Sequence, residues 1–264
     1  MKPLIFSRAL LFISIAAGFF LTSCVPGNGI SEPYIVDESR QKENIYYIPS
    51  APNAPLLSEK NDLNFNVAST TGSRFRGVEI QTAFLPSKHI GITGSYSHAA
   101  NSPEIKYNRF ELGSGYITKL NKGWHFETYA GFGAGKISNS HYTGSSEINL
   151  THFFLQPAVS VSNQKKTAQL GIISRFEGVN FKVADTLFNT EREPFSTGQL
   201  ISLYDQPFHI MWQPGLLFRF GWKNFKFHTA YSFSADLTNP DLYRANDNFS
   251  FGLSLRFNTT EKRL

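Results

Sequence analysis

The feature that most constrains this chain is a two-residue alternation of apolar and polar side chains, which runs from about residue 62 to residue 258. Residues 224–236 and 247–258 show it most clearly, because aromatic or aliphatic side chains stand at every second position. An α-helix would spread these side chains around its circumference, whereas a β-strand collects them on one face. The pattern therefore predicts an all-β fold.

Ten alternating segments can be counted, although an eight-stranded arrangement stays open because residues 62–71 and 147–162 alternate least regularly. Most segments exceed the mean soluble strand of about 5–6 residues and fit membrane-spanning strands of about 9–11 residues. The segments are approximately 62–71, 74–85, 88–98, 106–118, 123–137, 147–162, 166–178, 206–221, 224–236 and 247–258.

The connections between these segments alternate in length. Short connections at 85–88, 118–123, 163–166 and 223–224 alternate with longer ones at 99–105, 138–146, 179–205 and 237–246. The first connection, at residues 72–73, is short where a long one is expected. Short turns at one end and longer loops at the other are typical of outer-membrane barrels. We therefore predict an antiparallel, up-and-down transmembrane β-barrel.

Two turns give testable registers. A two-residue turn at 223–224 places Arg219 opposite His228 and pairs apolar with apolar side chains along the hairpin. A four-residue turn at 163–166 places His152 opposite Glu177. Both registers keep the apolar and polar faces apart, as a barrel requires.

The polar face is predicted to line the lumen and the apolar face to meet lipid. Charged residues are only 17% of the chain, against about 25% in average soluble domains. The expected lumen network consists of Glu79, Arg109, Glu111, Glu127, Arg175, Glu177, Arg219, His228 and Arg256. Aromatic residues beside the short turns are expected to form an interfacial girdle, and these are Phe84, Tyr116, Trp124, Phe220, Trp222 and Phe225.

The N-terminal residues have the pattern of a secretory signal. Lys2 and Arg8 precede an apolar run from Ala9 to Leu21, which is too short for a spanning helix. Leu21-Thr22-Ser23-Cys24 resembles a bacterial lipobox, in which the cysteine is acylated, for example with palmitate. This predicts a signal peptide over 1–23 and lipid attachment at Cys24.

The segment after Cys24 has a linker composition, with five prolines and no periodicity over residues 24–61. Tyr46-Tyr47-Ile48-Pro49 is its apolar part and is expected to pack locally or against the next domain. The predicted organisation is a Pro-rich tether over 24–61, a barrel over 62–258 and a C-terminal tail over 259–264. An even strand number places both barrel termini on one side, the periplasmic side, where a lipid on the inner leaflet would need the tether.

Together with the lipobox and the alternating first strand, two stretches resemble small outer-membrane β-barrel lipoproteins of Bacteroidota. They are APLLSEK at Ala54 to Lys60 and the hairpin GVEIQTAFLPSKHIGITGSYSHA at Gly77 to Ala99, in which Phe84 stands where tyrosine is frequent. The resemblance covers most of the chain and implies an outer-membrane barrel with a lipid-anchored N-terminus. It implies no activity.

Catalytic and metal sites receive little support. The best pair is His152 with Glu177, which could orient a base, but no nucleophile is evident beside it and a structural ion pair is favoured. His209 and His228 do not meet in the expected register, so no metal site is predicted. No cofactor motif occurs, and the net charge of +5 is spread too thinly for a nucleic-acid partner.

Three function classes remain open. The first is a structural or accessory barrel whose long loops contact another outer-membrane or periplasmic protein or the exterior. The second is a narrow, porin-like pore for ions or small solutes, although about ten strands leave a lumen that side chains can fill. The third is a hydrolase acting in the lumen or at its rim.

Overall fold

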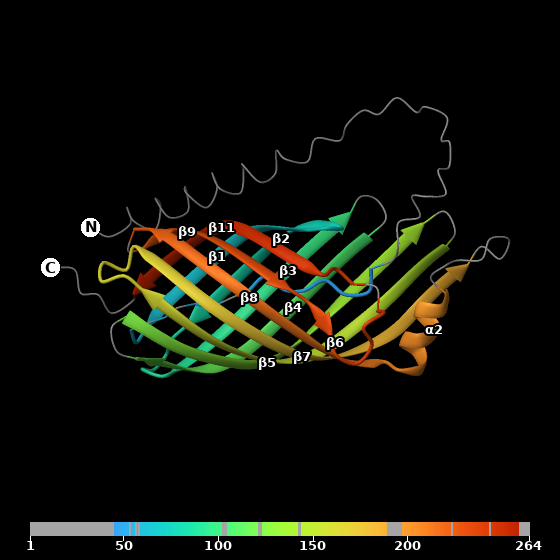
Figure 1. The fold of residues 1–264 in the computed structure, drawn as a ribbon, viewed down its shortest axis with the longest axis horizontal. Helices are drawn as coiled ribbons and strands as arrows, with labels where there is room; N and C mark the ends of the chain where they lie inside the picture. The colour runs from blue at the N-terminus through green and yellow to red at the C-terminus, as the bar shows by residue number, and fades with distance from the viewer. Residues whose placement is uncertain are drawn as a thin grey trace, which may run out of the picture. The chain divides into compact units, whose positions relative to one another are not determined.

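The computed structural model shows a closed antiparallel β-barrel (Figure 1). Ten long strands form its wall. It describes residues 45–52, 54, 55, 57, 59–101, 105–120, 123–141, 144–188, 197–222, 224–242 and 244–258. Sequential strands pair from β1 to β9, and β11 closes the ring between β9 and β1. The predicted fold class and the count of ten strands are thus confirmed.

A two-residue strand, β10, pairs with β8 at one end of the barrel, in addition to the ten long strands. Among the described residues, no helix is long and apolar enough to cross a membrane. The elements are β1 (Asp62–Gly72), β2 (Phe75–Phe84), β3 (Ile90–Asn101), β4 (Ile105–Lys119), β5 (Trp124–His141), β6 (Gly144–Ser162), β7 (Ala168–Phe188), α2 (Thr197–Asp205), β8 (Phe208–Gly221), β9 (Phe225–Phe233), β10 (Ala235–Asp236) and β11 (Asp247–Asn258).

The two ends of the barrel differ. One end, here called the turn end, carries the short connections after β2, β4, β6 and β8 and the two barrel termini, Asp62 and Asn258. The other end, here called the loop end, carries the long connections 189–207, which includes α2, and 234–246, which includes β10. The expected loop at 138–146 is mostly strand, and the expected loop at 179–205 begins as strand, because β5, β6 and β7 extend toward the loop end.

The two register predictions have different outcomes. Arg219 lies opposite His228, as the two-residue turn predicted. The prediction that His152 lies opposite Glu177 is wrong, since His152 pairs with Val179 and Glu177 with Phe154. The turn is longer than four residues, because Asn163 Oδ1 accepts hydrogen bonds from the backbone N–H groups of Thr167 and Ala168 at 2.8 and 3.2 Å. The register therefore shifts by two residues, which preserves the faces.

The side-chain pattern reverses along β4 to β7. Near the barrel's middle, apolar side chains such as Phe132 and Phe153 face outward and Arg175 and Glu177 face inward. Toward the loop end, Lys136 faces outward and apolar side chains turn inward. The inward set includes Ile105, Tyr107, Ile137, Ile148, Leu150, Val179 and Phe181, which form a core with Leu200 and Leu203 of α2. Strands that face lipid cannot carry this reversed pattern, so the reversal marks where they leave the hydrocarbon layer.

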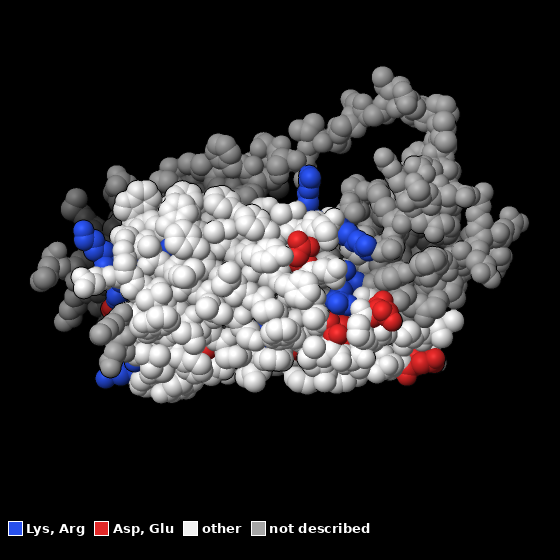
Figure 2. Space-filling view, in the orientation of Figure 1, with Lys and Arg blue, Asp and Glu red and all other residues white. Residues whose placement is uncertain are grey.

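Strand length agrees with that interpretation. The 21 residues of β7 correspond to roughly 50 Å along a barrel axis at a rise of about 3.3 Å and a tilt of about 45°. The hydrocarbon layer is only about 30 Å thick. On the face shown in Figure 2, a wide surface without charged side chains separates charges at the turn end from charges toward the loop end.

Candidate functional site: a filled lumen

The lumen holds an extended piece of the chain's own N-terminal region. The described residues of 45–57, here called the lumen segment, are all buried, and the segment runs inside the barrel as a blue trace in Figure 1. Twelve residue steps at about 3.1 Å give an extended length of about 37 Å, which exceeds the hydrocarbon thickness of about 30 Å. The segment is therefore long enough to pass through the whole membrane-spanning barrel.

Its sequence suits this environment. Pro49, Pro52 and Pro55 recur every third residue, which is the period of a polyproline II helix. Proline has no backbone N–H, so each one removes a donor that would otherwise need a partner in the lumen. Pro52 packs against the inner face of β8, where a Cβ added to Gly215 would lie 2.7 Å from Pro52 Cγ. Glycine at 215 therefore makes room for the segment.

Barrel side chains bind the backbone of the lumen segment along its length. Asn139 accepts a hydrogen bond from Ile45 N and donates one to Ile45 O, both at 3.1 Å. Glu79 accepts from Ala51 N at 2.9 Å, and Gln81 donates to Ala51 O at 3.3 Å. Asn248 donates to Pro49 O at 2.7 Å. Polar inner faces thus supply the partners that an extended backbone lacks outside a sheet.

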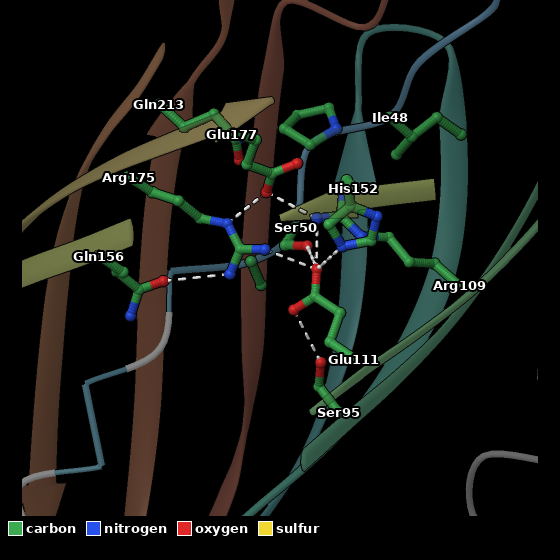
Figure 3. A network of polar contacts seen from close by, with 12 residues as sticks. Ile48, Ser50, Ser95, Arg109, Glu111, His152, Gln156, Arg175, Glu177 and Gln213 are labelled. Carbon is green, nitrogen blue, oxygen red and sulfur yellow. Dashed lines mark hydrogen bonds and ion pairs between the residues drawn. The ribbon is translucent and has the colours of Figure 1, made fainter. Parts of the chain in front are cut away.

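The centre of the lumen holds a buried charge network (Figure 3). Arg109 and Glu111 project from β4, and Arg175 and Glu177 project from β7. Arg175 donates to Glu111 at 2.6 Å, Arg109 donates to Glu177 at 2.6 Å, and Arg109–Glu111 and Arg175–Glu177 are also ion pairs. Two cations and two anions balance one another, which buried charges require.

The lumen segment is part of this network. The Tyr47 hydroxyl donates to Glu177 Oε2 at 2.8 Å and accepts from Gln213 and from Arg109. Ser50 Oγ donates to Glu111 Oε1 at 3.3 Å. The charge network therefore fastens the segment to three strands of the wall, β4, β7 and β8.

All nine residues predicted for the lumen network face inward. Eight are buried, and Arg256 is half-buried at the turn end, where it pairs with Asp62. Arg219, another turn-end member, donates to Pro55 O at 3.1 Å. Of the predicted girdle, Tyr116, Trp124, Phe220 and Trp222 are exposed on the outer face near the turn end, and Phe84 and Phe225 are half-exposed there. Cys24 and the signal peptide lie outside the described residues.

His152 and Glu177 are in the same network, but not as a catalytic pair. His152 Nε2 contacts Glu111 Oε1 at 3.0 Å, and the hydroxyls of Ser50 and Ser95 donate to the same Glu111 carboxylate. The carboxylate therefore lies between imidazole and hydroxyls, whereas nucleophile activation needs the imidazole in the middle. The described residues contain no cluster of three or more potential metal ligands.

Two small cavities lie beside the described residues of the segment. A cavity of about 20 Å³ beside Ala51, Glu79 and Gln156 has room for about one water molecule. A smaller one of about 10 Å³ lies beside Pro55, Arg219 and Lys226. With the segment in place, these cavities are too small for a solute path.

Sequence reasoning assigned residues 24–61 to a tether and missed the lumen segment. Its described part is buried in the barrel, a placement that the linker composition did not predict. The expectation that the apolar Tyr46–Ile48 stretch packs against the next domain is met, since these residues join the core at the loop end. The proline period of three was the available signal.

Comparisons with known proteins give similarities to solved structures only. No family model and no curated protein matches the sequence. Among solved structures, the chain is similar to the translocator domain of autotransporter NalP from Neisseria meningitidis, at 10% identity and a TM-score of 0.45, covering 77% of this chain and 91% of that one. It is also similar to the KdgM porin, at 12% identity and a TM-score of 0.34, covering 74% and 99%. The attachment invasion locus protein Ail of Yersinia pestis gives 12% identity and a TM-score of 0.30, covering 75% and 100%.

Proposed function

We propose that this protein is a closed outer-membrane barrel with a structural or accessory role, whose loop end faces the exterior and contacts a partner. The observation that carries the proposal is the lumen segment. This extended chain is bound along its length and joined to the central charges, and the cavities beside its described residues measure about 20 and 10 Å³. A solute pore needs a continuous aqueous path.

The loop end offers the surface for a partner. Beyond the reversal of the side-chain pattern, apolar side chains are exposed on an element that lipid does not cover: Tyr204 of α2 is 78% exposed and Ile201 is 55% exposed. Leu187, near the end of β7, and Leu237, on the connection 234–246, are exposed as well. Apolar groups gathered outside the lipid layer are typical of protein contact sites.

Single-channel recording tests closure. Purified wild-type protein in a planar lipid bilayer should give no discrete conductance steps. Reproducible steps in the folded protein would support the narrow-pore alternative instead. Barrel folding is checked by heat-modifiable migration on a gel, since a folded barrel and an unfolded chain migrate differently.

A photo-crosslinking amino acid at position 204 tests the partner surface. We expect a discrete crosslinked product in intact outer membranes, and none from the same amino acid at lipid-facing position 132, where Phe132 is 67% exposed. Equal products from both positions would refute a specific contact at the loop end.

The lipid anchor and the kinship with Bacteroidota lipoproteins belong to this proposal too. The anchor rests on the lipobox ending at Cys24, and the kinship rests also on the stretches Ala54 to Lys60 and Gly77 to Ala99. Globomycin should block maturation of the wild-type chain, and Cys24→Ala should abolish acylation. Normal acylation of Cys24→Ala would overturn this part.

A further inference from the structure

We infer that the chain passes through the barrel lumen before the first strand, so that the residues preceding Ile45 leave the barrel at the loop end and are presented on the exterior. An even number of strands was expected to keep the tether on the periplasmic side. The lumen segment adds one more crossing and reverses that expectation. The inference concerns the direction of threading and holds whether or not the barrel conducts.

Contacts at the loop end fix the start of the segment there. Ile45 is bound by Asn139 near the end of β5, and Tyr47 O accepts a hydrogen bond from Ala245 N of the connection 234–246 at 2.9 Å. Ile45, Tyr46 and Ile48 belong to the apolar core that Leu242 and α2 complete at this end. Ile45 therefore lies among loop-end elements.

Contacts at the middle and at the turn end give the direction. Ser50 and Ala51 lie at the level of Glu111 and Glu79. Pro55 O accepts hydrogen bonds from Asn64 and Arg219, and Leu57 packs with Leu85 and Ile117 beside the turn end. The chain then turns at 59–61 and enters β1 at Asp62. The lumen segment thus runs from the loop end at Ile45 to the turn end at Leu57.

The residues before Ile45 cannot return from the loop end to the turn end. Ile45, Tyr46 and Tyr47 have no exposed surface, so the described residues of the loop-end lumen pack closely around them. A polar backbone cannot cross the hydrocarbon layer outside the barrel without partners for its hydrogen-bonding groups. Residues before Ile45 must therefore begin their course on the loop-end side. Long loops of outer-membrane barrels face the exterior.

This threading gives the barrel a display role. It would carry its own N-terminal region across the outer membrane, hold it by the lumen segment, and present it on the exterior. If Cys24 is acylated, about 20 residues separate the lipid from the lumen, enough to span on the order of 70 Å when extended. The acyl chains could then reach the outer leaflet.

Epitope insertion on intact cells tests the inference. One variant carries a short epitope between Lys42 and Glu43, and matched variants carry it after Lys165 in a turn-end connection or between Glu193 and Pro194 in a loop-end connection. Antibody should bind the 42/43 and 193/194 variants on intact cells, and the 165 variant only after the outer membrane is permeabilised. Binding of the 42/43 variant only after permeabilisation, with 193/194 accessible beforehand, would overturn the inference.

A crosslink keeps the test decisive if an insertion prevents folding. In a Cys24→Ser background, Ile45→Cys with Asn139→Cys should be joined by a short bifunctional thiol reagent, whereas Ile45→Cys with Asn64→Cys at the turn end should not. The opposite result would show reversed threading. Neither experiment measures conductance, so an open pore would refute the proposed closure and leave the threading intact.

Discussion

Replacing Tyr47 with alanine should weaken the barrel more than any change of an exposed tyrosine. Tyr47 is fully buried in the lumen, and its hydroxyl joins Glu177, Gln213 and Arg109. Truncating a buried aromatic side chain to alanine costs about 3–5 kcal/mol through lost burial and the remaining cavity. Leaving the hydroxyl's partners short of a hydrogen bond adds about 1–3 kcal/mol. The total expected loss in free energy of unfolding is about 4–8 kcal/mol.

Urea unfolding in detergent micelles, followed by tryptophan fluorescence, measures this loss. Tyr47→Phe keeps the ring and removes only the hydroxyl, so it should lose about 1–3 kcal/mol. Tyr204→Ala, at an exposed position of α2, should change the free energy of unfolding by no more than about 0.5 kcal/mol. The reasoning is refuted if Tyr47→Ala and Tyr204→Ala have the same unfolding midpoint, because the ring would then not be packed in the lumen.

Three further changes test other parts of the structure. Gly215→Ala should destabilise the barrel by about 1–3 kcal/mol, since its Cβ would overlap Pro52. The matched change Gly171→Ala, whose Cβ would meet only ordinary contacts at 3.6 Å or more, should change the unfolding midpoint little. Equal midpoints for the two variants would contradict the close approach of Pro52 to Gly215. Glu177→Ala leaves Arg109 and Arg175 with one carboxylate fewer and should cost about 3–5 kcal/mol in the same urea titration, so an unchanged midpoint would argue against the network. Phe132→Arg on the lipid-facing surface should lower the free energy of unfolding in liposomes by about 2–4 kcal/mol, and Ser138→Arg, beyond the pattern reversal, by about 0–1 kcal/mol. Equal losses would contradict a membrane boundary between these two positions.

Much of the barrel could be predicted from the sequence because membrane strands must alternate. Each strand of the barrel needs one face for lipid and one for the lumen, so the predicted strands lie close to the observed bounds. Arg219 lies opposite His228, as predicted. The connection at 163–167 was misjudged because Asn163 builds a wider turn through its side chain. The placement of His152 therefore shifted by two residues, although its face did not.

The lumen segment could not be predicted from alternation, because it pairs with no strand. Its backbone is bound by side chains from across the barrel, such as Asn139, Gln81 and Asn248. These partners are separated from it by 30 to 199 residues in the sequence. Only the proline period and the apolar residues at 45–48 pointed to it, and both also fit a linker that packs locally.

Thiol labelling at position 54 tests most directly whether the lumen segment fills the barrel. Ala54 is fully buried against Ala158, Ile173, Leu217 and Ala230 on the inner wall. In a Cys24→Ser background, a cysteine at position 54 should stay unlabelled by a water-soluble maleimide while the barrel is folded and should react after unfolding. Labelling of the folded protein at the rate of a cysteine at exposed position 165 would contradict the account, because the segment would then lie outside the lumen wall.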